Sequence, residues 1–517
     1  MVIKVSLLVV FFCITIGVGI YFRKRNTDVN SFVLGGRCVG PWLSAFAYGT
    51  SYFSAVVFVG YAGQFGWKFG TSAVWIGLGN AFIGSLLAWA VLGRRTRVMT
   101  RHLGSATMPQ FFSMRYESNS LKLGASVITF VFLVPYTASL YNGLSRLFSM
   151  AFGVDFTICI VAMALLTCIY VIAGGYIATA VNDFIQGIIM LIGIVTVILS
   201  VLKVNGGFLA SLDALARVSD ASVSSTPGVF ASFFGPDPVS LLGVVLLTSV
   251  GTWGLPQMVQ KFYSIKSEKS ISKGMVISTV FAIVISGGCY FLGSFGRLFS
   301  DRVDVAKEGF DAIIPAMISG FSPLLVGIVV MVVLAASIST LAALVMTSAS
   351  TLTLDFIKGN IIKTMTEKSQ LLMIRSLIAF FVIVSTIIAI IQYKMSVSFI
   401  AQLMGISWGA LAGSFLAPFL FGLYWKRATK AAAWCSFAFG TLLMIANILF
   451  RSSFPAILQS PINAGAFTMI MGFIIVPVVS LMTKAPDRTN VDKMFSCYDN
   501  KIIVSARESL GEETSAE

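Results

Sequence analysis

Two hydroxyl residues lie side by side in the middle of a long apolar stretch. The stretch runs from about Pro323 to Leu354 and contains Ala335-Ala336-Ser337-Ile338-Ser339-Thr340. Ala336, Ser339 and Thr340 are spaced i, i+3 and i+4, so a helix places them on one face. One carbonyl and two hydroxyl oxygens there form half of a cage for a small hard cation. Sodium is the ordinary choice, and lithium and potassium are the other candidates. The alternative is that these hydroxyls hydrogen-bond to carbonyls of their own helix and bind no ion.

Two other apolar stretches contain residues that interrupt helices. The second holds Gly49-Thr50-Ser51, followed by Ser54, Gly60 and Gly63, and the seventh holds Gly251-Thr252-Trp253-Gly254-Leu255-Pro256-Gln257. Gly and Pro leave backbone carbonyls without helical partners, and in a membrane those carbonyls must bind something. Two broken helices five spans apart are typical of inverted-repeat transporters, whose binding site lies between the breaks. Close packing of Gly-rich helices is the alternative.

The composition indicates a membrane protein with many helical spans. The chain has 517 residues, of which 57% are hydrophobic and 11% are charged. Apolar runs of about twenty residues recur along it, which excludes a β-barrel as well as separate soluble domains. We expect one transmembrane domain over 1–483, with core repeats at about 42–204 and 239–424, and a short, loosely ordered cytoplasmic tail over 484–517. The roughly thirteen expected spans lie at about 5–22, 42–66, 71–93, 120–150, 155–175, 184–204, 239–263, 273–298, 322–354, 371–394, 397–424, 430–450 and 464–483.

The net charge of +15 reflects membrane topology and not nucleic-acid binding. Basic residues gather in alternate loops, which is the positive-inside pattern. The pattern predicts an amino terminus outside the cell and a carboxyl terminus in the cytoplasm. We expect the protein in the plasma (inner) membrane. The basic clusters are Arg23-Lys24-Arg25 with Arg37; Arg94, Arg95, Arg97 and Arg101; Lys261, Lys266, Lys269 and Lys273; Lys358, Lys363 and Lys368; Lys426, Arg427 and Lys430; and Lys484 with Arg488.

Several motifs in order resemble the sodium/solute symporter family, which includes the sodium/proline, pantothenate, sialic acid, sugar and monocarboxylate symporters. The resemblance covers about Phe32 to Leu481. It implies an all-α membrane fold with two inverted five-helix repeats of the leucine-transporter type, formed here by spans two to six and seven to eleven. The motifs that carry it are Phe32-Val33-Leu34-Gly35-Gly36, Gly174-Gly175 through Asn182-Asp183-Phe184-Ile185-Gln186-Gly187, Ala335 to Thr340, and Gly422-Leu423-Tyr424-Trp425-Lys426-Arg427-Ala428-Thr429.

The resemblance also implies an ion site. The sodium ligands would be the carbonyls of Thr50, Phe53 and Ala336 and the hydroxyls of Ser339 and Thr340. Some family members bind a second sodium through further serines one turn along the ninth span. Ala342 and Ala343 stand at those positions, so we expect one sodium per cycle. Asp183 occupies the family's acidic position and would serve as an exit relay for the ion, with an interfacial capping carboxylate as the alternative.

Matching to the family places a substrate pocket beside the ion. Each pocket residue has a plain alternative, an interhelical hydrogen bond. Proline symporters usually have an aspartate where Tyr52 stands and aromatic residues at Thr248 and Thr252, whereas sialic acid members have an arginine at Tyr136. The motif spacing is closest to the proline branch, and a monocarboxylate, pantothenate or a sugar are the other candidates. The expected pocket residues are Ser51, Ser54, Asn80, Tyr136, Thr248, Thr252 and Gln257.

These features predict a carrier and not an enzyme. We expect sodium-coupled symport of a small organic solute by a protein that functions as a monomer in the bilayer. No paired catalytic groups occur within the predicted spans. A proton-coupled carrier, a channel and a membrane sensor built on the same fold are the alternatives. Sodium-free uptake at acid pH would favour the proton.

Overall fold

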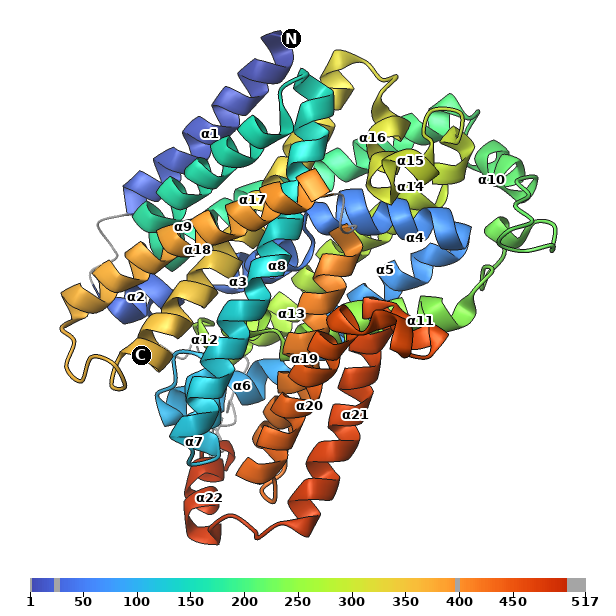
Figure 1. The fold of residues 1–517 in the computed structure, drawn as a ribbon. Coiled ribbons are helices and arrows are strands. Elements are labelled where there is room, and N and C mark those ends of the chain that lie inside the picture. Colours follow the sequence, from blue (N-terminus) through green and yellow to red (C-terminus); the bar gives the residue numbers. More distant parts are fainter. Residues whose placement is uncertain (1, 23–27, 396–399, 500–517) are drawn as a thin grey trace, which may run out of the picture.

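The protein is a bundle of long helices. The computed structural model describes residues 2–22, 28–395 and 400–499, and these ranges contain helices and turns but no strand (Figure 1). The basic run Arg23-Lys24-Arg25 and residues 500–517 of the tail lie outside the described residues. The helices are α1 (Val2–Phe22), α2 (Val29–Leu34), α3 (Pro41–Tyr52), α4 (Ala62–Phe69), α5 (Val74–Ala81), α6 (Arg94–Leu103), α7 (Met108–Arg115), α8 (Asn119–Phe152), α9 (Phe156–Val204), α10 (Phe208–Ala216), α11 (Pro238–Ser249), α12 (Pro256–Tyr263), α13 (Glu268–Ala282), α14 (Gly288–Ser294), α15 (Val305–Glu308), α16 (Ile313–Ile318), α17 (Pro323–Thr351), α18 (Glu367–Met395), α19 (Ile400–Tyr424), α20 (Lys430–Leu449), α21 (Pro461–Met482) and α22 (Arg488–Phe495).

The helices are numerous and apolar enough to cross a membrane many times. Among the described residues, ten are long and apolar enough to span, or eleven when the bent pair of α11 and α12 counts as one. Two of the ten are 48 and 49 residues long. Each contains a glycine with positive φ, Gly70 at 61° and Gly175 at 58°. A straight 49-residue helix would be roughly 70 Å long, more than twice the hydrocarbon core. Dividing these two helices at their glycines adds two spans to the eleven candidates, which gives thirteen among the described residues, the number that the hydropathy predicts.

The second span is broken between α3 and a π-helical turn at Val56–Tyr61. Phe53 ends α3 with an extended backbone, and its amide bonds to the carbonyl of Gly49 at 3.0 Å. Helical bonding resumes when the amides of Val57 and Phe58 bond to the Ser54 carbonyl. Gly49 allows α13 to pack closely, because a Cβ there would lie 2.4 Å from the Phe281 ring.

The seventh span is broken between α11 and α12. The two helices meet at an angle of 47°. Gly251–Gly254 forms a 3-10 turn, and Leu255 is extended because it precedes a proline. Pro256 then begins α12, where its missing N–H is no loss. Gly and Pro thus account for the break in the seventh span, whereas the second span breaks at Phe53, just after the predicted Gly49-Thr50-Ser51 run.

The unbroken helix α17 lies at the centre of the bundle. It packs against α3, α8 and α9, and α1 covers α9 and α17 from outside. Nearly nine-tenths of its most apolar window, 89%, is buried inside the protein. A hydroxyl on α17 must therefore find its partner on another helix, on its own backbone or in a bound ion.

The segment after α21 is more ordered than the sequence suggests. Residues Arg488–Phe495 form α22, which packs on α6. Asp492 pairs with Lys426 at 2.7 Å, and Asn490 donates to Glu117 at 2.8 Å. We expected a loosely ordered tail because this segment is polar. Its contacts come from loops far away in the sequence.

Candidate ion and substrate site

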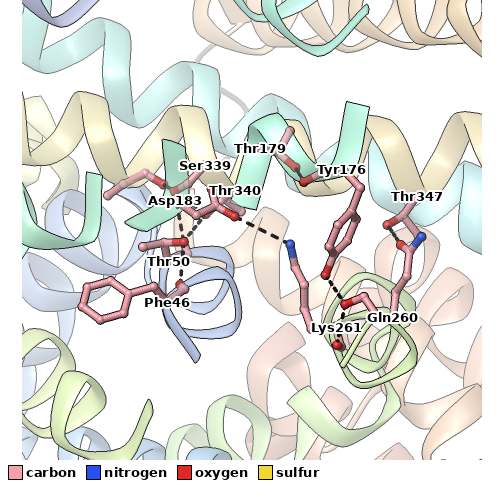
Figure 2. A network of polar contacts seen from close by, with 12 residues as sticks. Phe46, Thr50, Tyr176, Thr179, Asp183, Gln260, Lys261, Ser339, Thr340 and Thr347 are labelled. Atoms are coloured by element: carbon pink, nitrogen blue, oxygen red, sulfur yellow. Dashed lines mark hydrogen bonds and ion pairs between the residues drawn. The ribbon is translucent and has the colours of Figure 1, made fainter. Parts of the chain in front are cut away.

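The break in the second span faces the hydroxyl pair of α17. The Ser339 hydroxyl lies 3.2 Å and the Thr340 hydroxyl 3.0 Å from the carbonyl oxygen of Thr50 (Figure 2). That carbonyl comes just before the break, whereas the Thr50 side chain bonds back to Phe46 at 2.9 Å. The backbone oxygen of Thr50 is therefore the atom that meets α17.

The same two hydroxyls approach carbonyls of their own helix. Ser339 lies 3.0 Å from the Ala335 carbonyl and 3.2 Å from that of Ala336, and Thr340 lies 3.0 Å from the Ala336 carbonyl. Two hydroxyl protons must thus serve three carbonyl oxygens. The Ala335 and Ala336 carbonyls also accept helical amides, but the Thr50 carbonyl comes at a break. An oxygen-rich, proton-poor cluster of this kind suits a cation.

All five expected sodium ligands are buried. Thr50, Phe53, Ala336, Ser339 and Thr340 are each at most 2% exposed. The described contacts join Thr50 to α17 but do not join the Phe53 carbonyl to it. Phe53 sits at the extended end of α3, where its carbonyl is free of regular helical geometry. Four of the five expected ligand oxygens thus lie together, and the place of Phe53 in the set stays a prediction.

Asp183 on α9 faces a lysine that we expected elsewhere. Its carboxylate lies 3.8 Å from the Lys261 ammonium, and both side chains are at most 5% exposed (Figure 2). The positive-inside pattern predicts Lys261 in a basic cytoplasmic loop, but Lys261 lies within α12 and is buried. Neither Asp183 oxygen has a hydrogen-bond partner among the described residues. A lysine in the turn after a break is a signal that could have identified this pair.

The Lys261 end of the seventh span is tied to its neighbours. Tyr176 and Ser264 share a hydrogen bond of 2.7 Å, and Thr347 on α17 donates to Gln260 at 2.8 Å. At the other end of the bundle, a cavity of about 960 Å³ opens between α4, α11 and the start of α19. The site therefore lies in a bundle that is closed on the α12 side and hollowed on the α11 side.

Three of the expected pocket residues carry buried polar atoms that lack partners. These are the hydroxyls of Ser51 and Tyr136 and both amide atoms of Gln257, with no hydrogen bond among the described residues. Each residue is at most 1% exposed. Unpartnered buried polar groups are costly and point to a missing ligand or water. Ser51 and Gln257 belong to the two broken spans.

The other four expected pocket residues already have partners. The Asn80 amide donates to Ser286 at 3.0 Å and accepts from Ser249 at 3.1 Å. The remaining three form local hydrogen bonds. Thr248 donates to the Val244 carbonyl, and Thr252 donates to the Ser249 carbonyl. The Ser54 hydroxyl oxygen accepts from the Val56 amide. These contacts match the plain alternative of hydrogen bonds within and between helices.

Two aromatic residues were not among the expected pocket residues. Trp408 on α19 has a buried indole N–H without a partner among the described residues, and its ring lies 5.9 Å from that of Tyr136. The Tyr52 hydroxyl donates to the carbonyl of Thr248, which joins the two broken spans. A single Trp in an apolar span gives little signal in the sequence, because burial alone also explains it.

Comparison with known proteins agrees with this geometry. The sodium:solute symporter family matches residues 32–440. The chain belongs to this family. The family match makes it a sodium-coupled solute symporter of the membrane, as the motifs predict. Similar chains include a sodium/proline symporter of Staphylococcus aureus, which is 31% identical over 495 residues and 93% of each chain.

A solved structure supports the fold. A Na+-coupled sialic acid symporter in a substrate-bound outward-open state matches with a TM-score of 0.71 and 18% identity. The match covers 94% of this symporter and 99% of the solved chain. The predicted all-α fold with an inverted repeat is confirmed. At this identity the likeness concerns the fold and carries no information about the substrate.

Proposed function

We propose that this symporter imports a small zwitterionic amino acid, with proline as the first candidate, together with one sodium ion. The name of the Staphylococcus aureus relative supports proline. The free polar groups of Ser51, Tyr136 and Gln257 are neutral, which suits a solute with no net charge. A monocarboxylate, pantothenate or a sugar remain the competing substrates.

The observation that carries the ion site is the contact between the Thr50 carbonyl and the hydroxyls of Ser339 and Thr340. We assign sodium to the oxygens of Thr50, Phe53, Ala336, Ser339 and Thr340. When sodium enters, the hydroxyl protons turn outward and the lone pairs face the ion. The ion then holds the broken span against the unbroken one.

The absence of side-chain oxygens at Ala342 and Ala343 supports a single sodium. Both alanines line a small cavity that Gln257 and Lys261 also line. The ammonium of Lys261 already faces Asp183, the acid that would help a departing ion. We assign Asp183 to the exit path, with Lys261 as the cation that compensates it between cycles.

Coupling follows if the ion and the solute both favour one arrangement of the two breaks. Sodium that stabilises the substrate-competent state raises substrate affinity, and the reverse is equally true. An inward sodium gradient and the membrane potential, about 2.3 kcal/mol per charge per 100 mV, then drive uptake. No covalent step is required. We place the amino terminus outside the cell and the α22 side of the protein in the cytoplasm. We also propose that the protein functions as a monomer.

The test is uptake of radiolabelled L-proline into proteoliposomes with and without an imposed sodium gradient. We expect accumulation only with inward sodium, and competition by excess unlabelled substrate. Parallel assays with lactate, pantothenate and glucose separate the substrate classes. Uptake of one of these in place of proline would refute the amino acid assignment. Gradient-free uptake at acid pH would refute sodium coupling in favour of protons.

A further inference from the structure

A cavity of about 250 Å³ lies where four spans begin or end on one face of the molecule. α8 begins at Asn119, α19 ends at Tyr424, α20 begins at Lys430 and α21 ends at Met482. In Figure 1 the ends of α7, α20, α21 and α22 gather at this lower end of the bundle. The cavity therefore lies at the boundary between the membrane and water.

The charge around the cavity is unbalanced. Arg115, Lys430 and Lys484 line it, and Glu117 is its acidic member. Among the described residues, none of the three basic side chains forms an ion pair. Glu117 is engaged by the Asn490 amide at 2.8 Å. Three positive groups against one carboxylate favour an anion.

Arg115 is a buried lining residue of the cavity that backbone carbonyls hold in place. It is 1% exposed, and it donates to the Gly422 carbonyl at 2.8 Å and to the Trp425 carbonyl at 2.9 Å. Its remaining terminal nitrogen, Nη1, has no hydrogen-bond partner among the described residues. The guanidinium also lies over the rings of Tyr116 and Phe495, and no carboxylate neutralises it among the described ion pairs. Such a charge raises the affinity of the adjoining space for an anion.

Exposed apolar and aromatic side chains lie at the ends of the spans next to the cavity. Leu481 and Met482, which precede Lys484, are 64% and 81% exposed. Tyr424, 42% exposed, lies at the end of the neighbouring span. Exposed apolar and aromatic side chains at the ends of spans mark the interface between acyl chains and head groups. An anion that arrives here from the bilayer would bring acyl chains to lie along α21.

We propose that this cavity binds the phosphate of an anionic glycerophospholipid. Lys430 and Lys484 contact the phosphate oxygens as point charges, and Arg115 adds a fixed positive potential behind them. The acyl chains lie outside on the exposed ends of α20 and α21. Basic pockets between transmembrane helices are known to bind anionic lipid head groups. The lipid would brace α22 against the spans, since Met494 of α22 also lines the cavity.

The test uses native mass spectrometry of the purified full chain in detergent. The probes are dioctanoyl phosphatidylglycerol, dioctanoyl phosphatidylcholine and sodium phosphate. We expect one phosphatidylglycerol to bind saturably and phosphatidylcholine at least tenfold more weakly. The variant K430Q/K484Q should raise the Kd for phosphatidylglycerol at least tenfold. K493Q, an exposed lysine of α22 outside the cavity, is the matched control and should change it less than twofold.

Three outcomes would overturn the proposal. Equal affinity for the two lipids would show that head-group charge is irrelevant. An equal loss in K493Q would show a general surface effect. Competition by sodium phosphate at the lipid's own concentration would indicate a site for free anions. The assay measures no transport, so its result is independent of the proposed substrate and ion.

Discussion

The hydroxyl oxygen of Thr340 lies 3.0 Å from the carbonyl oxygen of Thr50, although 290 residues separate them along the chain. This contact joins a broken span to an unbroken one. In the proposed mechanism it is the place where a bound ion would control the relative position of the two.

Removing either hydroxyl should weaken sodium binding. In Ser339→Ala and Thr340→Ala, the sodium concentration for half-maximal uptake should rise roughly tenfold, equivalent to about 1.4 kcal/mol. The reason is the loss of one ligand of a buried cation. Ser337→Ala is the matched control, since its hydroxyl donates to the Val333 carbonyl of the same helix at 2.6 Å. A similar rise in Ser337→Ala, or no rise in the other two, would contradict the assignment.

Substitutions of pocket residues should change the KM, whereas substitutions of structural residues should change the melting temperature. Ser51→Ala and Gln257→Ala should raise the KM for the substrate roughly tenfold with little change in melting temperature, because their polar atoms have no hydrogen-bond partner to lose within the described part of the chain. Asn80→Ala should instead lower the melting temperature, because it leaves Ser286 and Ser249 without a buried partner. Uptake kinetics and thermal unfolding in detergent measure the two effects. An unchanged melting temperature in Asn80→Ala would contradict this division.

Replacing either partner of the Asp183–Lys261 pair by an uncharged residue should destabilise the protein. Lys261→Met leaves a buried carboxylate without its cation and should cost about 3–5 kcal/mol of stability. Lys261→Arg should keep the fold. The double variant Asp183→Asn/Lys261→Met should recover part of the lost stability, because neither charge remains. Additive losses in a double-mutant cycle would show that the two groups do not interact.

Asp311 should make stability depend on pH. It lies in the loop between α15 and α16, is 2% exposed, and accepts a hydrogen bond from the Ile400 amide at 3.2 Å. Burial raises its pKa above the ordinary 3.8, against the opposing charge of Arg146. The folded state therefore binds this proton more tightly than the unfolded state. The contribution of Asp311 to stability is then fully present at low pH and is lost as pH rises from 3.8 through the raised folded pKa.

Asp311→Asn should flatten that part of the pH profile, because Asn cannot ionise but still offers an oxygen to the Ile400 amide. Melting temperatures measured between about pH 4 and pH 7 in detergent provide the comparison. The same slope in wild type and variant would assign the pH dependence to other groups.

Gly66 should not tolerate a side chain. A Cβ there would lie 2.0 Å from the carbonyl carbon and oxygen of Gly293 on α14. Backbone cannot move aside as a side chain can, so Gly66→Ala should cost about 3 kcal/mol or more. Fluorescence-detected size exclusion after heating measures the loss. Gly17→Ala, with open space around the added Cβ, is the control and should behave as wild type.

Local patterns in the sequence were enough to predict the elements of the site. Helical periodicity placed Ala336, Ser339 and Thr340 on one face, and Gly and Pro predicted the breaks near Thr50 and Pro256. These signals are local because they depend on residues within one or two turns. The family motifs supplied the pairing of the second and ninth spans.

Which polar groups contact one another depends on how the helices pack. Lys261 looked like one of several loop lysines, yet it faces Asp183 inside the protein. The sequence makes Asn80 and Gln257 equally suited to a substrate, yet among the described residues Asn80 has two hydrogen-bond partners and Gln257 has none. In a membrane interior every polar group needs a partner, and that partner is set by how distant helices pack. Residue types and local spacing therefore fix which side chains can bind an ion or a solute, and helix packing fixes which of their polar atoms lack a protein partner among the described residues.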